Sequence, residues 1–203
     1  MKGKWLYIID DEAIVRASII SLFQADGGWD HAEFANSDSF LAALDSLDPG
    51  CVLVDMQLPG SNGSVIVEAL SHRTPSFPFV VVTGFSDFAT AVSMFRLGAV
   101  DFLHKPVDPV ALFDAVERAL HRLRGDGQWQ ALVAHAQSRV AALTSEEDRS
   151  MALIFEGQSN ADIASAMGVT PRDVQRARAL ALAKLDAPTI FDAMRVFALA
   201  GRL

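Results

Sequence analysis

The feature that most constrains the fold is the alternation of short apolar runs with amphipathic stretches across residues 5–124. Two of these runs, CVLV and FVVV, contain no alternating polar residue, which is typical of strands buried on both faces of a sheet. Strands that alternate with helices predict a parallel sheet covered by helices on both sides. The predicted strands are WLYII (5–9), HAEFA (31–35), CVLV (51–54), FVVVT (79–83) and VDFLH (100–104).

The pattern changes after this unit. A last helix is predicted from about Pro109 to Arg124, where GDG breaks it, and a second helical stretch covers roughly 128–142. After Leu143 the apolar residues keep helical periodicity and no strand-like run remains. We therefore expect an α/β domain at 1–124, a partly helical linker at 125–142 and a small all-α domain at 143–203.

Charge divides the chain in the same way. Residues 1–124 contain 9 basic and 16 acidic side chains, a net charge of −7, whereas residues 143–203 contain 7 and 8, a net charge of −1. This asymmetry indicates two units with different partners.

Cysteine and hydropathy point to a cytoplasmic protein. The single cysteine, Cys51, cannot form an intramolecular disulfide, and it lies in an apolar stretch, as expected in a reducing compartment. No apolar run approaches the ~20 residues of a membrane span. The apolar stretch at the N-terminus ends at Asp10, too early for a secretory signal.

Three acids are predicted to meet at one edge of the sheet. Asp10 and Asp11 end the first strand, and Asp55 ends the third. If these strands are neighbours, their carboxyl ends flank the crevice in which open α/β sheets bind ligands. Three carboxylates without a nearby histidine or cysteine suit a hard cation, and Mg²⁺ typically takes one or two carboxylates plus waters and phosphate oxygens.

The fourth and fifth strands bring complementary groups to the same edge. Thr83 ends FVVVT, and Lys105 follows VDFLH, so a hydroxyl and an ammonium group can hydrogen-bond to a phosphoryl group there. Because a carboxylate can act as a nucleophile and form an aspartyl-phosphate, Asp55 is the predicted acceptor. An aspartate at a strand end is more often a turn or helix-capping residue, and a lone Lys-Pro or Thr-Gly pair has no diagnostic value. The prediction therefore depends on the ordered set.

Four motifs in the first ~120 residues, IIDDE, VDMQLPGSNG, VVVTG and DFLHKP, resemble the receiver domain of two-component response regulators. The resemblance implies a flavodoxin-like (βα)5 fold. It implies that Asp10, Asp11 and Asp55 bind Mg²⁺ and that Asp55 accepts a phosphoryl group from a histidine kinase.

The same resemblance assigns further roles. The backbone carbonyl of Gln57 would be an additional metal ligand, Thr83 and Lys105 would sense the phosphoryl group, and Phe102 would be the aromatic switch. The Lys105–Pro106 bond would be cis. Two residues beyond Thr83, the bulky Phe85 is expected to screen the acyl phosphate from water.

The C-terminal region has the signals of a helix-turn-helix unit. Ser159 is a predicted N-cap, Gly168 can end the helix in a left-handed conformation, and Thr170 caps a second helix with Pro171 in its first turn. In the second helix a buried stripe is predicted at helical spacing, formed by Val174, Ala177, Ala181 and Leu185.

The opposite face of that helix is basic or amide-bearing, which suits entry into the DNA major groove. The candidate DNA-binding residues are Arg172, Gln175, Arg176, Arg178 and Ala179. A plain solvated helix face in a small bundle is the alternative, since a strongly basic footprint is missing.

Residues 143–185 are similar to the DNA-binding domain of LuxR/FixJ-type regulators, and the tail APTIFDAMRVFALAGRL resembles the closing helix through which FixJ-type regulators pack as dimers. The sequence departs from the family pattern at four places. Glu146 and Asp148 stand where arginine is usual, Asp173 replaces a threonine near a phosphate contact, and Ala177 replaces a histidine.

Together these patterns predict a response regulator in which phosphorylation controls dimerisation and binding to double-stranded promoter DNA, with RNA polymerase as a further candidate partner. The dimer would form through the fourth helix, fifth strand and fifth helix, at a surface with Phe95, Arg96, Asp101 and Asp108. The chain is expected to be a phosphoryl acceptor capable of self-dephosphorylation rather than an enzyme. The rival hypothesis is a phospho-dependent protein-interaction adaptor whose helical domain no longer binds DNA.

Overall fold

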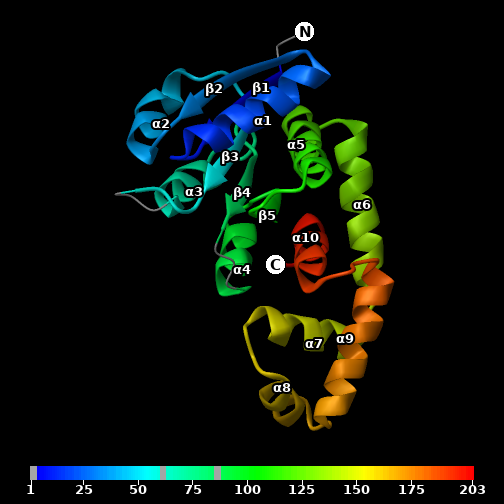
Figure 1. The fold of residues 1–203 in the computed structure, drawn as a ribbon. Coiled ribbons are helices and arrows are strands. Elements are labelled where there is room, and N and C mark those ends of the chain that lie inside the picture. The colour runs from blue at the N-terminus through cyan, green and yellow to red at the C-terminus, as the bar shows by residue number, and fades with distance from the viewer. Residues whose placement is uncertain (1–3, 60–62, 85–87) are drawn as a thin grey trace. The chain divides into compact units, whose positions relative to one another are not determined.

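The computed structural model of the protein describes residues 4–59, 63–84 and 88–203, and it contains the predicted parallel sheet (Figure 1). Within these residues the sheet has five parallel strands in the order β2-β1-β3-β4-β5. The winding direction therefore reverses between β1 and β3, as in flavodoxin-like folds. The strands are β1 (Lys4–Ile9), β2 (Trp29–Phe34), β3 (Cys51–Asp55), β4 (Phe79–Thr83) and β5 (Asp101–His104).

Strand β2 begins two residues before its predicted start. Gly27 and Gly28 both have positive φ angles, 75° and 77°, and turn the chain immediately before Trp29. Trp29 then pairs with Lys4, the first residue of β1, so the two strands run in register along their whole length. The polar Asp30 interrupts the apolar pattern at this point, so hydropathy alone did not predict the earlier start.

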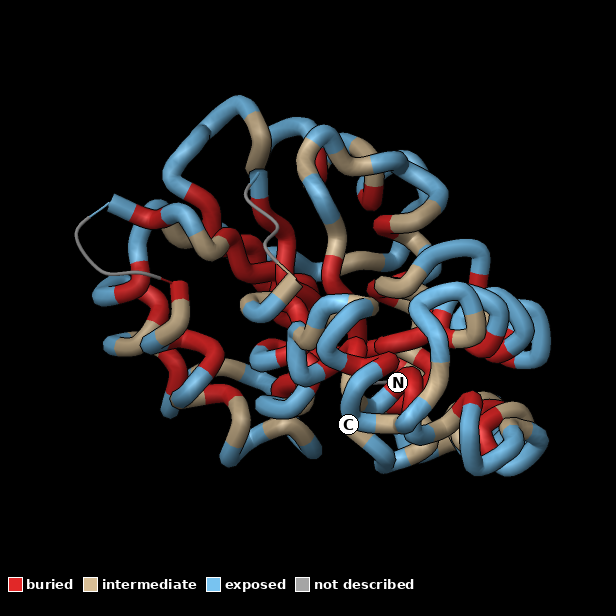
Figure 2. Tube along the Cα trace, turned by 90° about the horizontal axis from the view of Figure 1, so that it is seen from below, coloured by how far each residue is buried: buried red, intermediate tan, exposed pale blue. Residues whose placement is uncertain are grey.

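Helices cover the sheet on both sides. Helices α1 and α5 share one face, because Ile19 and Phe23 of α1 and Leu112 of α5 belong to one core with Leu53 of β3. Helix α2 lies beside α3 and β2. Along the helices buried residues alternate with exposed ones (Figure 2). The helical segments up to residue 124 are α1 (Ala13–Asp26), α2 (Ser37–Ala43), the 3-10 turn η1 (Leu44–Ser46), α3 (Ser64–Ser71), α4 (Phe88–Arg96) and α5 (Pro109–Arg124).

The bounds of α5 are those predicted, because local signals define both ends. The Asp108 carboxylate accepts a hydrogen bond from the Ala111 amide, and Pro109 occupies the first turn. Gly125 ends the helix in the left-handed region with a φ of 58°. The next helix, α6 (Gly127–Ala141), starts two residues later and one residue before its predicted start at about 128.

The chain divides into two compact units. The first contains Met1–Ser86 and Leu97–Trp129, and the second contains Asp87–Arg96 and Gln130–Leu203. Helix α4 is therefore grouped with the second unit, although it lies inside the sequence range expected for the α/β domain. Its Phe88 ring is 6.2 Å from the Phe191 ring of α10.

The second unit is helical in its described residues and contains the predicted helix-turn-helix. Ser159 caps α8, Gly168 has a φ of 69°, and the four residues of the predicted stripe in α9 are buried. No helix among the described residues has the length and apolar character needed to cross a membrane. The C-terminal helices of the second unit are α7 (Ser145–Phe155), α8 (Asn160–Met167), α9 (Pro171–Leu185) and α10 (Ile190–Leu199).

Threonine-acid pairs define the starts of three of these helices. Each threonine side chain accepts a hydrogen bond from the backbone of an acidic residue three positions later, and that acid accepts one from the threonine backbone. Both partners satisfy amides that a helix end otherwise leaves without acceptors. The pairs are Thr144 with Glu147, Thr170 with Asp173, and Thr189 with Asp192.

Candidate functional site

The sheet brings the predicted polar residues to the carboxyl ends of its strands. Asp10 follows β1 directly, and Asp55 is the last residue of the neighbouring strand β3. Thr83 ends β4, where it is buried, and Lys105 follows β5. The topology places all four at one edge, beside the point where the winding reverses.

The three predicted acids converge. One carboxylate oxygen from each of Asp10, Asp11 and Asp55 lies within 4.8 Å of the others. Asp10 and Asp55 are each only 3% exposed, whereas Asp11 faces solvent. Buried carboxylates at this separation repel one another unless a positive charge offsets them.

Lys105 supplies such a charge. Its Nζ donates hydrogen bonds of 2.7 Å to Oδ2 of Asp10 and to Oδ2 of Asp55. Burial of Lys105 lowers its pKa, but the hydrogen bonds and charges of the two carboxylates outweigh burial and raise the pKa above its usual value. The ammonium therefore remains protonated and joins β1, β3 and β5 at the site.

The second oxygens of the two buried acids are held by the backbone. Asp10 Oδ1 accepts a hydrogen bond of 2.9 Å from the Glu12 amide, and Asp55 Oδ1 accepts one of 2.9 Å from the Gln57 amide. These contacts give both carboxylates defined orientations. Gln57 thus lies in the loop directly beyond the predicted acceptor, as the sequence indicated.

Gly63 is a site residue that sequence reasoning missed. Its amide donates to the Met56 carbonyl at 3.2 Å, and a Cβ atom at this position would lie 2.3 Å from the Asp55 carbonyl oxygen. Only glycine permits this approach of two backbone segments. The last glycine of the PGSNG sequence was the available signal.

Phe102 is buried on β5, and the Lys105–Pro106 bond is cis as predicted. The Gln57 side chain extends over Gly84, since a Cβ atom on Gly84 would lie 3.0 Å from Gln57 Oε1. Phe85, the predicted water screen, lies outside the described residues.

The donor set fits a hard divalent cation. The cluster contains three carboxylates and no histidine or cysteine, and its oxygens are close enough to share one ion. Asp10, Asp11 and Asp55 are therefore residues that can hold a metal ion.

Comparison with known proteins decides the family. The profile described as Response regulator receiver domain matches residues 6–117. The chain belongs to the response regulators. It is 32% identical over 198 residues to the transcriptional regulatory protein FixJ of Bradyrhizobium diazoefficiens, covering 98% of this chain and 96% of that protein.

Other relatives match over both units of this response regulator. The C4-dicarboxylate transport transcriptional regulatory protein DctR of Rhodobacter capsulatus is 33% identical over 94% of this chain and 98% of its own. The crystal structure of full-length FixJ from B. japonicum has a TM-score of 0.56 and 32% identity, and covers 100% of this chain and 99% of that one. The chain is thus a FixJ-like transcriptional regulatory response regulator with a receiver domain and a helical C-terminal region.

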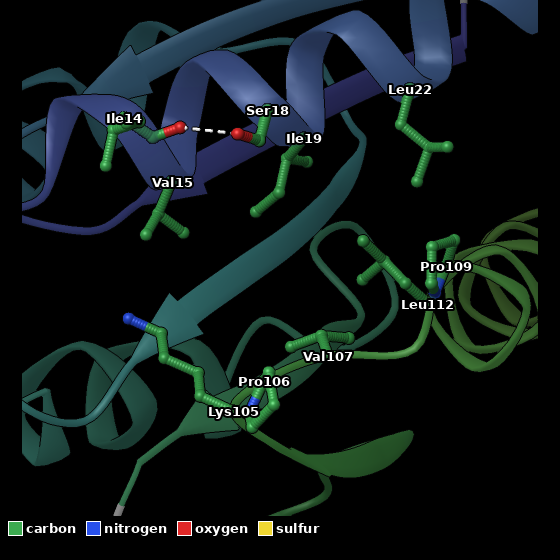
Figure 3. Close-up of a pocket in the computed structure, with 10 residues that line it drawn as sticks. All are labelled: Ile14, Val15, Ser18, Ile19, Leu22, Lys105, Pro106, Val107, Pro109 and Leu112. Atoms are coloured by element: carbon green, nitrogen blue, oxygen red, sulfur yellow. Dashed lines mark hydrogen bonds between the residues drawn. The ribbon is translucent and has the colours of Figure 1, made fainter.

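An apolar groove of about 540 Å³ adjoins the acidic site of this response regulator (Figure 3). Ile14 and Val15 of α1 lie on one side of it, and Lys105, Pro106 and Val107 lie on the other. Ile14 is 75% exposed and contributes to the apolar lining of the groove. The groove is lined by Ile14, Val15, Ser18, Ile19, Leu22, Lys105, Pro106, Val107, Pro109 and Leu112.

The residues predicted to contact DNA all lie on the exposed surface of α9, and they are Arg172, Gln175, Arg176, Arg178 and Ala179. Asp173, between two of these arginines, has a structural role as the acid of a capping pair. Its Oδ2 accepts from the Thr170 hydroxyl at 2.6 Å, and its Oδ1 lies 3.2 Å from Nη2 of Arg176. Hydrogen bonds from Thr170 hold the pKa of Asp173 below its usual value, with smaller contributions from the nearby arginines.

The surface predicted for dimerisation needs a correction. Phe95 and Asp101 are buried, and Asp101 forms an ion pair with Arg118 of α5 and accepts the Phe102 amide. Of the four residues expected at that surface, Arg96 and Asp108 are exposed. Asp101 was misplaced because its partner lies 17 residues away on another element, which hydropathy does not reveal.

Proposed function

We propose that Asp55 is the phosphoacceptor of this response regulator and that a sensor histidine kinase is the donor. One Asp55 carboxylate oxygen attacks the phosphorus of a phosphohistidine, so a P–O bond forms while the P–N bond breaks. The electron pair of the broken bond returns to the imidazole, which takes up a proton. The observation that carries this proposal is the position of Asp55 at the end of β3, where the Lys105 ammonium lies 2.7 Å from Asp55 Oδ2 and equally close to the second buried carboxylate, Asp10.

Mg²⁺ is the proposed cofactor. Asp10, Asp11 and Asp55 would hold it, together with the Gln57 backbone carbonyl. When bound, it would neutralise negative charge on the phosphoryl oxygens and on the acceptor. Its preference for oxygen donors matches the residues present.

Two further side chains respond to the phosphoryl group in this proposal. The Thr83 hydroxyl and the Lys105 ammonium, at the ends of β4 and β5, donate hydrogen bonds to phosphoryl oxygens. Lys105 must first release Asp55 Oδ2, which it contacts in the unphosphorylated protein. Phe102, on the strand that Lys105 follows, then changes rotamer and alters the surface near β5.

The groove beside Lys105 is the proposed contact for the donor protein. Its apolar lining borders the residue that bridges to Asp55, so a protein seated there brings its phosphohistidine to the acceptor. The exposed Ile14, which lines the groove, supplies apolar area that such a partner can bury.

The output that we propose is regulated binding to double-stranded promoter DNA, in a dimer formed on phosphorylation, with RNA polymerase as a further candidate partner. The relatives are named as transcriptional regulators, and α9 exposes three arginines. The Asp173 charge, which favoured the rival adaptor, is partly offset by Arg176 and by the amide end of its own helix. The protein would act in the cytoplasm, where promoter DNA is located, and as an acceptor rather than as an enzyme.

Two experiments test the proposal. Asp55→Asn should fold normally and take no label from a small acyl-phosphate donor with Mg²⁺, because the amide keeps the shape and loses the nucleophile. Labelling at the wild-type level would place the acceptor elsewhere.

Thr83→Ala should accept phosphate yet fail to dimerise in sedimentation experiments. Dimerisation as in wild type would refute the proposed role of Thr83.

The dependence of DNA affinity on salt concentration distinguishes DNA binding from the adaptor alternative. Affinity for duplex DNA should fall steeply as the salt concentration rises, since each phosphate contact releases counterions. Arg176→Ala should reduce that affinity, whereas Arg202→Ala, which removes an arginine outside α9, should not. Absence of any salt-dependent binding by the phosphorylated protein would favour the adaptor.

A further inference from the structure

Arg16 of α1 is nearly buried next to the acidic site. Its side chain is 13% exposed, although it belongs to the first turns of a helix on the surface of the sheet unit. Arginine is rarely buried to this extent unless its donors are paired. The partners of its guanidinium therefore indicate what it does.

The guanidinium joins the acidic loop to a neighbouring strand. Nη1 donates to the Asp10 carbonyl at 2.7 Å and to the Asp11 carbonyl at 3.2 Å. Nε donates to Glu33 Oε2 on β2 at 2.8 Å. One planar group thus binds the backbone of both acids and fixes it against β2, which a single ammonium cannot reproduce.

Helix α1 receives no side-chain hydrogen bond from its own N-cap residue. Glu12 occupies its N-cap position and makes no side-chain capping hydrogen bond. By contrast, α5 and α9 begin with a capping carboxylate or hydroxyl. The turn from β1 into α1 is therefore held by three contacts. The Asp10 amide donates to the Phe34 carbonyl, the Asp10 carboxylate accepts from the Glu12 amide, and Arg16 donates to the Asp10 carbonyl.

We propose that Arg16 is a positioning residue for the cation site: it holds the Asp10–Asp11 backbone so that both carboxylates face one ion. This inference rests on the magnesium site proposed above. Glu33 balances the Arg16 charge, so the arginine constrains the loop without adding a net positive charge beside the ion.

The proposal predicts an effect opposite in sign to simple electrostatics. Removing a positive charge next to three carboxylates would strengthen cation binding by Coulomb attraction. Loss of positioning would weaken it, and loss of partners that orient metal ligands typically costs about 10- to 100-fold in affinity. The sign of the change therefore distinguishes the two effects.

The test is isothermal titration of the full chain with MgCl₂ alone. Arg16→Met should raise the Kd for Mg²⁺ by about tenfold or more. The matched control is Arg73→Met, which removes the same charge and breaks a 2.7 Å ion pair with Asp45 on the same domain. That control should bind Mg²⁺ as wild type does.

A second variant guards against misfolding. Arg16→Lys keeps the charge, and it should still bind Mg²⁺ several-fold more weakly, since one ammonium cannot serve both carbonyls and Glu33. Tryptophan fluorescence in EDTA reports folding of each variant. The weakening should persist at high ionic strength, where the contribution of a nearby charge is screened.

The outcomes separate this inference from the proposed function. Equal or tighter Mg²⁺ binding by Arg16→Met and Arg16→Lys would overturn the role of Arg16 and leave the cation site standing. Failure of the wild-type chain to bind Mg²⁺ would overturn the site itself, and the role of Arg16 with it. Weaker binding that disappears at high salt would also overturn the positioning role, because the positioning of a backbone segment does not depend on ionic strength.

Discussion

Replacing Lys105 by methionine should make the stability of the receiver domain depend on Mg²⁺. Methionine keeps most of the side-chain volume but removes the ammonium that contacts Asp10 and Asp55 at 2.7 Å each. The lysine is 18% exposed, and both carboxylates are almost fully buried, so the variant leaves two acids close together without a cation.

The cost follows from the burial of these groups. Removing one partner of a buried ion pair typically destabilises a protein by about 3–5 kcal/mol. For a domain of this size, 3 kcal/mol corresponds to a fall of about 10 °C in the unfolding midpoint. Mg²⁺ at 100 times its Kd should then restore about 2.7 kcal/mol, because it binds only the folded site.

The assay is thermal unfolding of the full chain in EDTA and in MgCl₂, followed by tryptophan fluorescence. The three tryptophans are Trp5, Trp29 and Trp129, so the signal reports the first compact unit alone. Lys4→Met is the control, since Lys4 forms a half-exposed ion pair with Glu117 and should cost about 1 kcal/mol or less.

The result that would refute this reasoning is a Lys105→Met midpoint in EDTA equal to that of wild type. The carboxylates would then be tolerated without their lysine, and the bridge would contribute nothing to stability. A low midpoint that Mg²⁺ does not raise would instead show that the three acids do not form a cation site.

Three further predictions concern other parts of the chain. Burial raises the pKa of Tyr7 to about 12, and the nearby Asp48 and Asp30 add to the shift. The only tyrosine should therefore titrate near that pH while the domain is folded, and the stability of the domain should fall as the pH rises above 10. A tyrosinate absorbance midpoint near 10 in the folded protein would contradict this. Gly63→Ala should reduce acyl-phosphate labelling of Asp55 and destabilise the domain by about 1–3 kcal/mol, since the new Cβ meets backbone atoms that cannot move aside; wild-type labelling and midpoint would count against it. Burial would raise the pKa of Glu147, but hydrogen bonds from Lys184 and Thr144 outweigh burial and lower it. Ionised Glu147 should therefore stabilise the helical unit above about pH 4.5, and this stabilisation should be lost as the pH falls through the pKa of the folded state. Glu147→Gln should flatten the pH dependence of unfolding followed by circular dichroism, and an equally steep profile would exclude the contribution.

Local signals explain which features the sequence predicted well. The ends of α5 depend on Asp108, Pro109 and Gly125, which lie next to one another in the chain and act through their own backbone. The caps at Ser159 and Thr170 are local in the same sense. The acidic site was also predictable, because parallel strands bring their carboxyl ends to one edge whatever the details of packing.

Features that depend on distant partners were not predicted. The hydrogen bond from Lys105 to Asp10 joins residues 95 positions apart. The hydrogen bond from Arg16 on α1 requires Glu33 on β2. The burial of Asp101 follows from Arg118, whose position on α5 is known only after the helix docks on the sheet. Sequence reasoning identified the residue types at the site but not the contacts that hold them in place.

The edges of the sheet restrict how two copies of the chain can associate. Strand β2, at one edge, exposes Asp30, His31 and Glu33, and strand β5, at the other, has only four residues. Charged and short edge strands discourage the pairing of one sheet with another, which is a common route to aggregation. A receiver built in this way can reach high local concentrations without its sheets joining into a continuous ribbon. Any dimer that phosphorylation promotes should therefore form through helices and remain reversible.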